Sequence, residues 1–137
     1  MDTKKKIMVV DDELALRAIV TAELQEEGYD VTSAGDGDEA INLLRSEHFD
    51  LVLLDNKMQK VDGSEVLRFV RQSDPTITVV MVTGSRDLPI EVDAEIRAAD
   101  EVIIKPFDLK TLLSTVDRYL QTPDQAPANG SSAERPS

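Results

Sequence analysis

Short runs of apolar residues recur along most of the chain and are separated by more polar stretches. Each run is continuous rather than alternating, which is typical of strands that are buried on both faces of a parallel sheet. A weaker run follows Gly28 and favours a strand at an edge. The pattern therefore predicts strands at residues 7–10, 29–33, 51–54, 77–82 and 102–104.

The segments between these runs carry apolar residues at helical spacing. In the first of them, Leu16, Val20 and Leu24 fall on one face, and Gly28 is suited to end the helix. Asp108 is placed to cap the last helix at its N-terminus. The spacing predicts helices over residues 14–27, 38–47, 64–72, 88–99 and 109–120.

Strands and helices thus alternate five times, which predicts a parallel sheet with helices on both faces. For a chain of 137 residues we expect an α/β fold of the flavodoxin-like class. This fold is a (βα)5 three-layer sandwich whose parallel five-stranded sheet has the order 2-1-3-4-5. We expect one domain over residues 1–121 and a disordered C-terminal tail or linker over 122–137, where large apolar residues are missing.

The composition narrows the functional classes. A net charge of −12 disfavours direct binding of nucleic acid, because that binding begins when a basic surface neutralises phosphates. The absence of cysteine excludes disulfides, thiol nucleophiles and thiolate-bound zinc, and it suits a reducing cytoplasm. No signal peptide is visible, and no apolar run approaches the ~20 residues of a membrane span. We expect a cytoplasmic protein that contacts neither nucleic acid nor membrane.

Polar residues stand at the C-terminal ends of four predicted strands. Asp11-Asp12 follows the first strand, and Asp55, Thr83 and Lys105 end the third, fourth and fifth. In a parallel sheet these ends lie along one edge, and strands one and three flank the topological switch point where open α/β sheets bind ligands. We therefore expect three carboxylates, one hydroxyl and one ammonium group in a single crevice.

Such a crevice favours a particular chemistry. Three neighbouring carboxylates repel one another, and a hard divalent cation with oxygen ligands relieves that repulsion. Mg²⁺ suits a site with carboxylates, retained waters and a phosphate oxygen. A carboxylate can also act as a nucleophile and form an aspartyl-phosphate, after which phosphoryl transfer requires mainly positioning and charge neutralisation. Each residue alone is more often a turn, cap or surface residue, but the combination indicates phosphoryl chemistry.

These motifs resemble the receiver domain of bacterial two-component response regulators over about residues 5–120. The matching segments are residues 9–12, 49–55, 58, 62–63, 82–84 and 105–107. The resemblance implies that Asp55 accepts a phosphoryl group and ligates Mg²⁺, or Mn²⁺ in its place. Further ligands would be Asp12, Asp11 (mainly through a metal-bound water) and the backbone carbonyl of Lys57.

The resemblance has further implications for the site and its partners. Thr83 and Lys105 would contact the phosphoryl group, and the bond before Pro106 would be cis. The module would be no enzyme, although it would assist its own phosphorylation and dephosphorylation. The donor would be a sensor histidine kinase or a phosphotransfer protein. Phosphorylation would switch a surface for a downstream protein or an output domain, with a possible homodimer through residues 88–120.

Three positions depart from the family pattern. Gln59 follows Met58 where proline is usual, so we expect a less rigid loop. Lys57 places a long cation near the acceptor, and we expect it to alter the lifetime of the phosphoryl group. Val102 stands where an aromatic residue usually rotates together with Thr83, so the output surface should respond differently or weakly.

Three other functions are compatible with parts of the pattern. A phosphatase of the haloacid-dehalogenase type also uses a strand-end Asp, but it carries a second Asp at the position of Lys57. A flavodoxin-like nucleotide or flavin binder needs a phosphate-binding loop where this chain has Asp11-Asp12-Glu13. A degenerate receiver would serve as a docking surface without phosphoryl turnover; Val102 is compatible with this alternative, but the intact set of acceptor residues argues against it.

Three other basic residues indicate no catalytic or binding role. His48 is the only histidine, and a lone histidine cannot build a metal site. Arg68 and Arg71 fall on a polar helix face, so we expect solvent around both.

Overall fold

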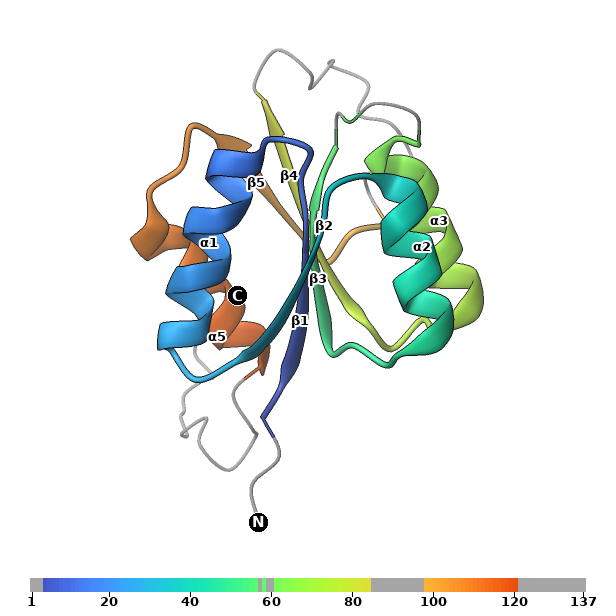
Figure 1. The fold of residues 1–137 in the computed structure, drawn as a ribbon, viewed down its shortest axis with the longest axis horizontal. Coiled ribbons are helices and arrows are strands. Elements are labelled where there is room, and N and C mark those ends of the chain that lie inside the picture. The colour runs from blue at the N-terminus through green and yellow to red at the C-terminus, as the bar shows by residue number, and fades with distance from the viewer. Residues whose placement is uncertain (1–3, 57, 59–60, 85–97, 121–137) are drawn as a thin grey trace.

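The computed structural model describes residues 4–56, 58, 61–84 and 98–120. In this part of the chain, five parallel strands form a sheet of order β2-β1-β3-β4-β5 (Figure 1). The strands are β1 (Lys6–Val10), β2 (Asp30–Ala34), β3 (Leu51–Asp55), β4 (Thr78–Gly84) and β5 (Glu101–Lys105). The predicted flavodoxin-like α/β fold and its strand order are confirmed.

Helices cover both faces of this sheet. Figure 1 shows α1 (Leu14–Glu26) and α5 (Leu109–Leu120) on one side, with α2 (Gly37–Ser46) and α3 (Gly63–Ser73) on the other. Of the predicted helix at 88–99, only residues 98 and 99 belong to the described part of the chain. Lys57, Gln59 and the predicted tail at 122–137 lie outside it. No helix in the described part of the chain is long and apolar enough to cross a membrane.

Two apolar clusters fill the space on either side of the sheet. Successive residues of a strand point to opposite faces, so the central strands β1 and β3 supply both clusters in alternation. Toward α2 and α3 these strands contribute Met8, Val10, Val52 and Leu54. Toward α1 and α5 they contribute Ile7, Val9, Leu51 and Leu53. Burial on both faces explains why these strands are continuous apolar runs in the sequence.

Local hydrogen bonds fix the ends of the helices. Gly28 has φ of 100°, a conformation that favours glycine, and it ends α1 as the sequence predicts. The Asp36 side chain accepts a hydrogen bond from the backbone of Glu39 at 2.8 Å, which starts α2 one residue before the predicted position. Asp108 accepts one from the backbone of Thr111 at 3.0 Å and caps α5. Hydrogen bonds from Thr111 also lower the pKa of Asp108.

Arg71 does not point into solvent, so that expectation was wrong. Its side chain is only 22% exposed, and its guanidinium donates to the carbonyls of Ile77 at 2.8 Å and Ala98 at 3.0 Å. It also donates to the Asp100 carboxylate at 2.8 Å. The planar guanidinium has several donors, so one arginine can satisfy acceptors from separate segments. Arg71 thereby ties the end of α3 to the segments that lead into β4 and β5.

Candidate functional site

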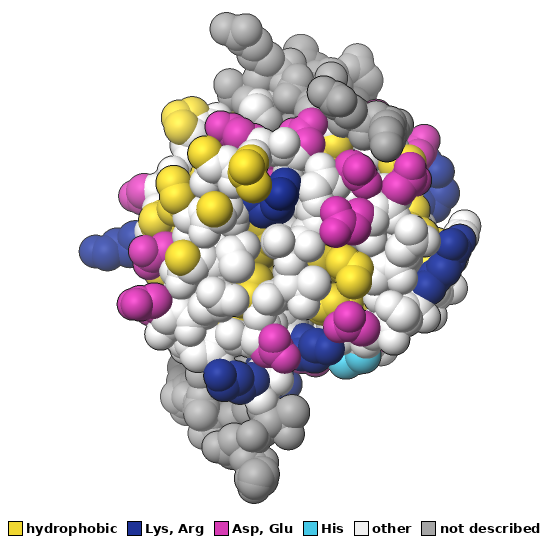
Figure 2. Space-filling model, in the orientation of Figure 1, with side chains coloured by type: hydrophobic (Ala, Val, Ile, Leu, Met, Phe, Trp, Pro, Cys, Tyr) yellow, Lys and Arg dark blue, Asp and Glu magenta, His cyan; other side chains and the backbone are white. Residues whose placement is uncertain are grey.

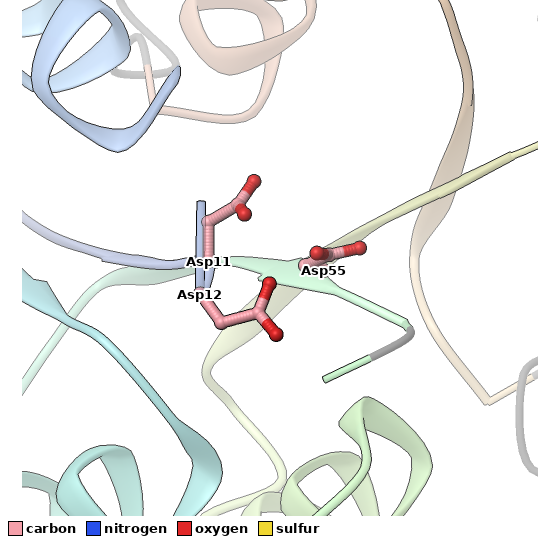
Figure 3. A group of neighbouring side chains, drawn as sticks. All are labelled: Asp11, Asp12 and Asp55. Atoms are coloured by element: carbon pink, nitrogen blue, oxygen red, sulfur yellow. The ribbon is translucent and has the colours of Figure 1, made fainter. Parts of the chain in front are cut away.

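The strands β1 and β3 lie side by side, and acidic residues stand at their C-terminal ends. Asp55 is the last residue of β3, while Asp11 and Asp12 directly follow β1. Carboxylate oxygens of these three residues lie within 4.8 Å of one another (Figure 3). The structure thus brings together the three carboxylates that the sequence assigns to a metal. The fourth predicted ligand, the backbone carbonyl of Lys57, lies outside the described residues.

Two of the three carboxylates are shielded from solvent. Asp55 is 5% exposed and Asp11 is 7% exposed, whereas Asp12 is open to solvent. Burying a charge is costly unless it has a partner. Lys105 is that partner, with its Nζ atom 3.6 Å from Asp55 Oδ1 and 3.9 Å from Asp11 Oδ2. Three carboxylates against one ammonium still leave excess negative charge, and this oxygen-rich donor set fits a hard divalent cation.

Thr83 lies on β4, one position beyond Val82, which pairs with Asp55 in the sheet. It is fully buried, and its hydroxyl donates to the carbonyl of its neighbour Gly84 at 3.4 Å. The next strand ends at Lys105, and the Lys105–Pro106 peptide bond is cis. The hydroxyl and the ammonium group are therefore carried by the ends of adjacent strands, beside the three carboxylates.

The backbone of Asp55 is in close contact with the start of α3. The Gly63 amide donates to the carbonyl of Asn56 at 3.0 Å. A Cβ atom on Gly63 would lie 2.4 Å from the carbonyl oxygen of Asp55, closer than real Cβ contacts occur. Only glycine permits this approach. The sequence singles out the Asp62-Gly63 pair, but only the structure shows that Gly63 supports the backbone of Asp55.

Arg17 is a residue of this site that the sequence interpretation did not identify. Its Nη1 atom donates to the backbone carbonyl of Asp11 at 2.6 Å. Side chains of a helix lean toward its N-terminus, so a long side chain in the first turn of α1 can reach the preceding loop. This preferred direction of helix side chains is the feature from which the contact between Arg17 and the loop could have been predicted. By contrast, His48 lies away from the three clustered carboxylates. Its Nε2 atom is 3.3 Å from the carboxylate of Asp50, and its Nδ1 atom is 3.9 Å from that of Asp74.

Comparison with known proteins identifies the family. The family model of the response regulator receiver domain matches residues 7–117. The chain belongs to this family. Response regulator receiver domains are signalling modules of phosphorelay systems, so this receiver is a component of two-component signalling. Membership decides against the phosphatase and flavin-binding alternatives.

Relatives of known identity are similar over most of this receiver. The DNA-binding response regulator MtrA of Mycobacterium tuberculosis is 37% identical over 93% of this chain and 56% of its own length. The response regulator TrrA of Thermotoga maritima, solved in complex with Mg(2+)-BeF, has a TM-score of 0.77 and 36% identity. That comparison covers 85% of this chain and 99% of TrrA.

TrrA has also been solved in complex with the histidine kinase ThkA. In that structure the similar chain has a TM-score of 0.74 and 35% identity, over 85% of this chain and 98% of its own length. The receiver spans about half the length of the curated relatives that it matches.

Proposed function

We propose that Asp55 of this receiver accepts a phosphoryl group from a sensor histidine kinase or a phosphotransfer protein, in a reaction that depends on Mg²⁺. Asp55 is a nearly buried carboxylate at the switch point of the sheet, with two further carboxylates within 4.8 Å and the Lys105 ammonium at 3.6 Å. This arrangement combines a carboxylate nucleophile, the positive charge of Lys105 and the oxygen ligands of a divalent cation.

The chemistry follows from these groups. A carboxylate oxygen of Asp55 attacks the phosphorus of the donor, so that an O–P bond forms while the P–N bond to the donor imidazole breaks. The protonated imidazole leaves as the neutral ring. Lys105 stabilises the charge that accumulates on the phosphoryl oxygens. The carboxylates of Asp11, Asp12 and Asp55, together with the backbone carbonyl of Lys57, would hold Mg²⁺, or Mn²⁺ in its place. The cation would supply positive charge that neutralises the same oxygens.

The same groups support the loss of the phosphoryl group. Attack of water on phosphorus releases inorganic phosphate and restores the Asp55 carboxylate, so the domain assists both reactions. The Thr83 hydroxyl makes only a long hydrogen bond of 3.4 Å, and we assign it the role of turning to a phosphoryl oxygen. Lys57 is expected to change the phosphoryl lifetime. Val102, which is 36% exposed on β5, replaces the usual aromatic partner of the threonine.

A neighbouring surface favours docking of the donor on α1. Leu14 is 68% exposed and Ile19 is 50% exposed, although the opposite side of this helix is buried in the core. Figure 2 shows hydrophobic side chains gathered over α1. A helix that is apolar on its outer face as well as its inner face indicates a binding surface. Leu14 follows Asp12 by two residues, so a donor on this surface is close to the acceptor.

The phosphorylation state of the receiver must reach an output. MtrA is a DNA-binding response regulator of which this chain matches 56%. We propose that the receiver acts on an output domain or on a separate downstream protein in the cytoplasm, with residues 122–137 as a tail or linker. A phosphorylation-dependent homodimer through 88–120 is part of this proposal.

Intact-protein mass spectrometry tests the acceptor. The protein is incubated with acetyl phosphate or phosphoramidate, with MgCl₂ or with EDTA, and a purified histidine kinase provides a third donor. We expect a Mg²⁺-dependent gain of one phosphoryl mass in the wild type and in the control Asp38→Asn, whose carboxylate is exposed on α2. Asp55→Asn should show no gain. A gain in Asp55→Asn would contradict the proposal, and no gain from any donor would favour the degenerate docking module.

A further inference from the structure

Arg17 holds the loop that carries two of the three carboxylates. It belongs to the first turns of α1, and its Nη1 atom donates to the backbone carbonyl of Asp11 at 2.6 Å. The side chain is partly buried rather than free in solvent. A hydrogen bond from a charged donor is about twice as strong as one between neutral groups. The contact is therefore strong enough to fix the position of the Asp11 carbonyl oxygen.

The other polar atoms of Asp11 are also engaged. Its amide donates to the carbonyl of Ala34 at 3.2 Å, and its Oδ1 atom accepts from the amide of Glu13 at 2.9 Å. Its Oδ2 atom lies 3.9 Å from Lys105 Nζ. These contacts hold the residue and its side chain; among the residues that the structure describes, only Arg17 donates to the carbonyl.

The carbonyl of Asp11 also sets the direction of Asp12. A peptide bond is planar, so fixing the oxygen of Asp11 fixes the amide nitrogen and Cα of Asp12 in the same plane. The Asp12 carboxylate is exposed, and the described residues supply no hydrogen bond to it. Its approach to the other two carboxylates thus depends on its backbone, and that backbone depends on Arg17.

Gly35 leaves room for this arrangement. A Cβ atom on Gly35 would lie 3.1 Å from Nη1 of Arg17 and 3.6 Å from its Cζ. Such a contact is tighter than most, so an alanine at this position would displace the guanidinium by a few tenths of an ångström. The loop after β2 therefore lies against the same guanidinium nitrogen that donates to the Asp11 carbonyl.

We propose that Arg17 is a positioning residue for the metal site: by fixing the Asp11–Asp12 peptide it holds Asp12 where it can share a divalent cation with Asp11 and Asp55. This inference rests on the proposed function, because it requires that the three carboxylates bind Mg²⁺. Arg17 acts through the backbone and touches neither the cation nor the phosphoryl group.

The charge of Arg17 makes the proposal testable by the sign of the effect. A guanidinium near a cation site repels Mg²⁺, so if charge alone mattered, its removal would tighten Mg²⁺ binding. Loss of a positioning contact would instead weaken binding. Groups that orient metal ligands typically change metal affinity by about 10–100-fold when they are removed. Arg17→Met, which keeps the apolar stem and loses the charged fork, separates the two effects.

The test is isothermal titration of the whole chain with MgCl₂. We expect Arg17→Met to bind Mg²⁺ about 10–100-fold more weakly than the wild type. Arg17→Lys keeps a donor and should recover part of the loss. The matched control is Arg118→Met. Arg118 lies on α5, its side chain is 54% exposed, and it pairs with Glu101 of β5. This variant loses the same charge, and its affinity for Mg²⁺ should equal that of the wild type. Thermal melting of each variant verifies the fold.

A double-mutant cycle with Gly35→Ala adds a readout that general destabilisation does not mimic. Gly35→Ala should weaken Mg²⁺ binding in the wild type but have no further effect in Arg17→Met, because the displaced group is then absent. Equal or tighter binding by Arg17→Met, or additive effects in the cycle, would overturn the role of Arg17 while leaving the proposed function intact. Failure of the wild type to bind Mg²⁺ would refute the proposed metal site and this inference with it.

Discussion

Replacing Gly63 with alanine should displace the acceptor from its site. The added Cβ would lie 2.4 Å from the carbonyl oxygen of Asp55 and 2.9 Å from the Cα of Asn56. Both contacts are with backbone atoms, which cannot rotate away. Real Cβ atoms do not approach closer than 3.0 Å, so α3 and the end of β3 must separate by about 0.6 Å. The amide of Gly63 also donates to the carbonyl of Asn56, which ties the two segments together.

The magnitude can be stated for both stability and chemistry. Forcing an extra methyl group into a filled space typically costs about 1–3 kcal/mol, and we expect the free energy of unfolding to fall by that amount. A misplacement near 1 Å in a reacting group can cost about 100-fold in rate, so a shift of Asp55 by about half that distance should slow phosphorylation by roughly 10-fold. Alanine is otherwise less flexible than glycine in the unfolded chain, which stabilises the fold by about 0.4–1 kcal/mol and opposes the steric effect.

These opposite signs make the assay decisive. Urea denaturation followed by circular dichroism gives the free energy of unfolding, and intact mass after timed exposure to acetyl phosphate gives the rate. Ser64→Ala, at the next position of α3, is the matched control and should change neither quantity appreciably. If Gly63→Ala is as stable as the wild type or more stable, and is phosphorylated at the same rate, the close contact with the acceptor backbone does not matter as the structure indicates.

Three further predictions concern the surface, the site and pH. The double variant Leu14→Ser, Ile19→Ser should slow phosphoryl transfer from a histidine kinase by more than 10-fold. Its rate of phosphorylation by acetyl phosphate should be unchanged, and equal losses with both donors would argue against docking on α1. Lys105→Met should slow phosphorylation by acetyl phosphate about 100-fold, by loss of charge stabilisation, while Mg²⁺ binding measured by calorimetry persists. Burial and the hydrogen bond to Glu101 raise the pKa of Tyr119 above its ordinary value of 10.0, so stability should fall as pH rises past that value. Urea midpoints from pH 9 to 11 should fall more steeply in the wild type than in Tyr119→Phe, and identical slopes would refute this.

The fold could be predicted because its central strands β1, β3 and β4 are buried on both faces. That burial makes each central strand a continuous apolar run, as in Leu51–Asp55, and the alternation with helices then leaves few topologies. The predicted ends of the helices were less accurate, because a helix end depends on local hydrogen bonds rather than on the spacing of hydrophobic residues. The sequence placed the start of α2 at Asp38, whereas the side chain of Asp36 caps the helix and starts it at Gly37.

The candidate site could be predicted as a set of residues but not as an arrangement. Strand ends of a parallel sheet must share one edge, so Asp11 and Asp55 could be placed together without coordinates. The contacts made by long side chains could not be placed in that way. Arg17 and Arg71 both donate to backbone carbonyls outside their own helices, and no periodic pattern distinguishes such an arginine from one in solvent. Close backbone contacts, such as that of Gly63, are equally invisible in the sequence.

Chemical localisation of the phosphoryl group is the most direct test that Asp55 is the acceptor. Borohydride reduces an acyl phosphate on aspartate to homoserine, which peptide mass spectrometry locates in the chain. After phosphorylation in the presence of Mg²⁺, we expect homoserine at position 55 and at no other aspartate, and none when Mg²⁺ is removed. Homoserine at position 11 or 12, or a phosphoryl group that resists reduction, would contradict it.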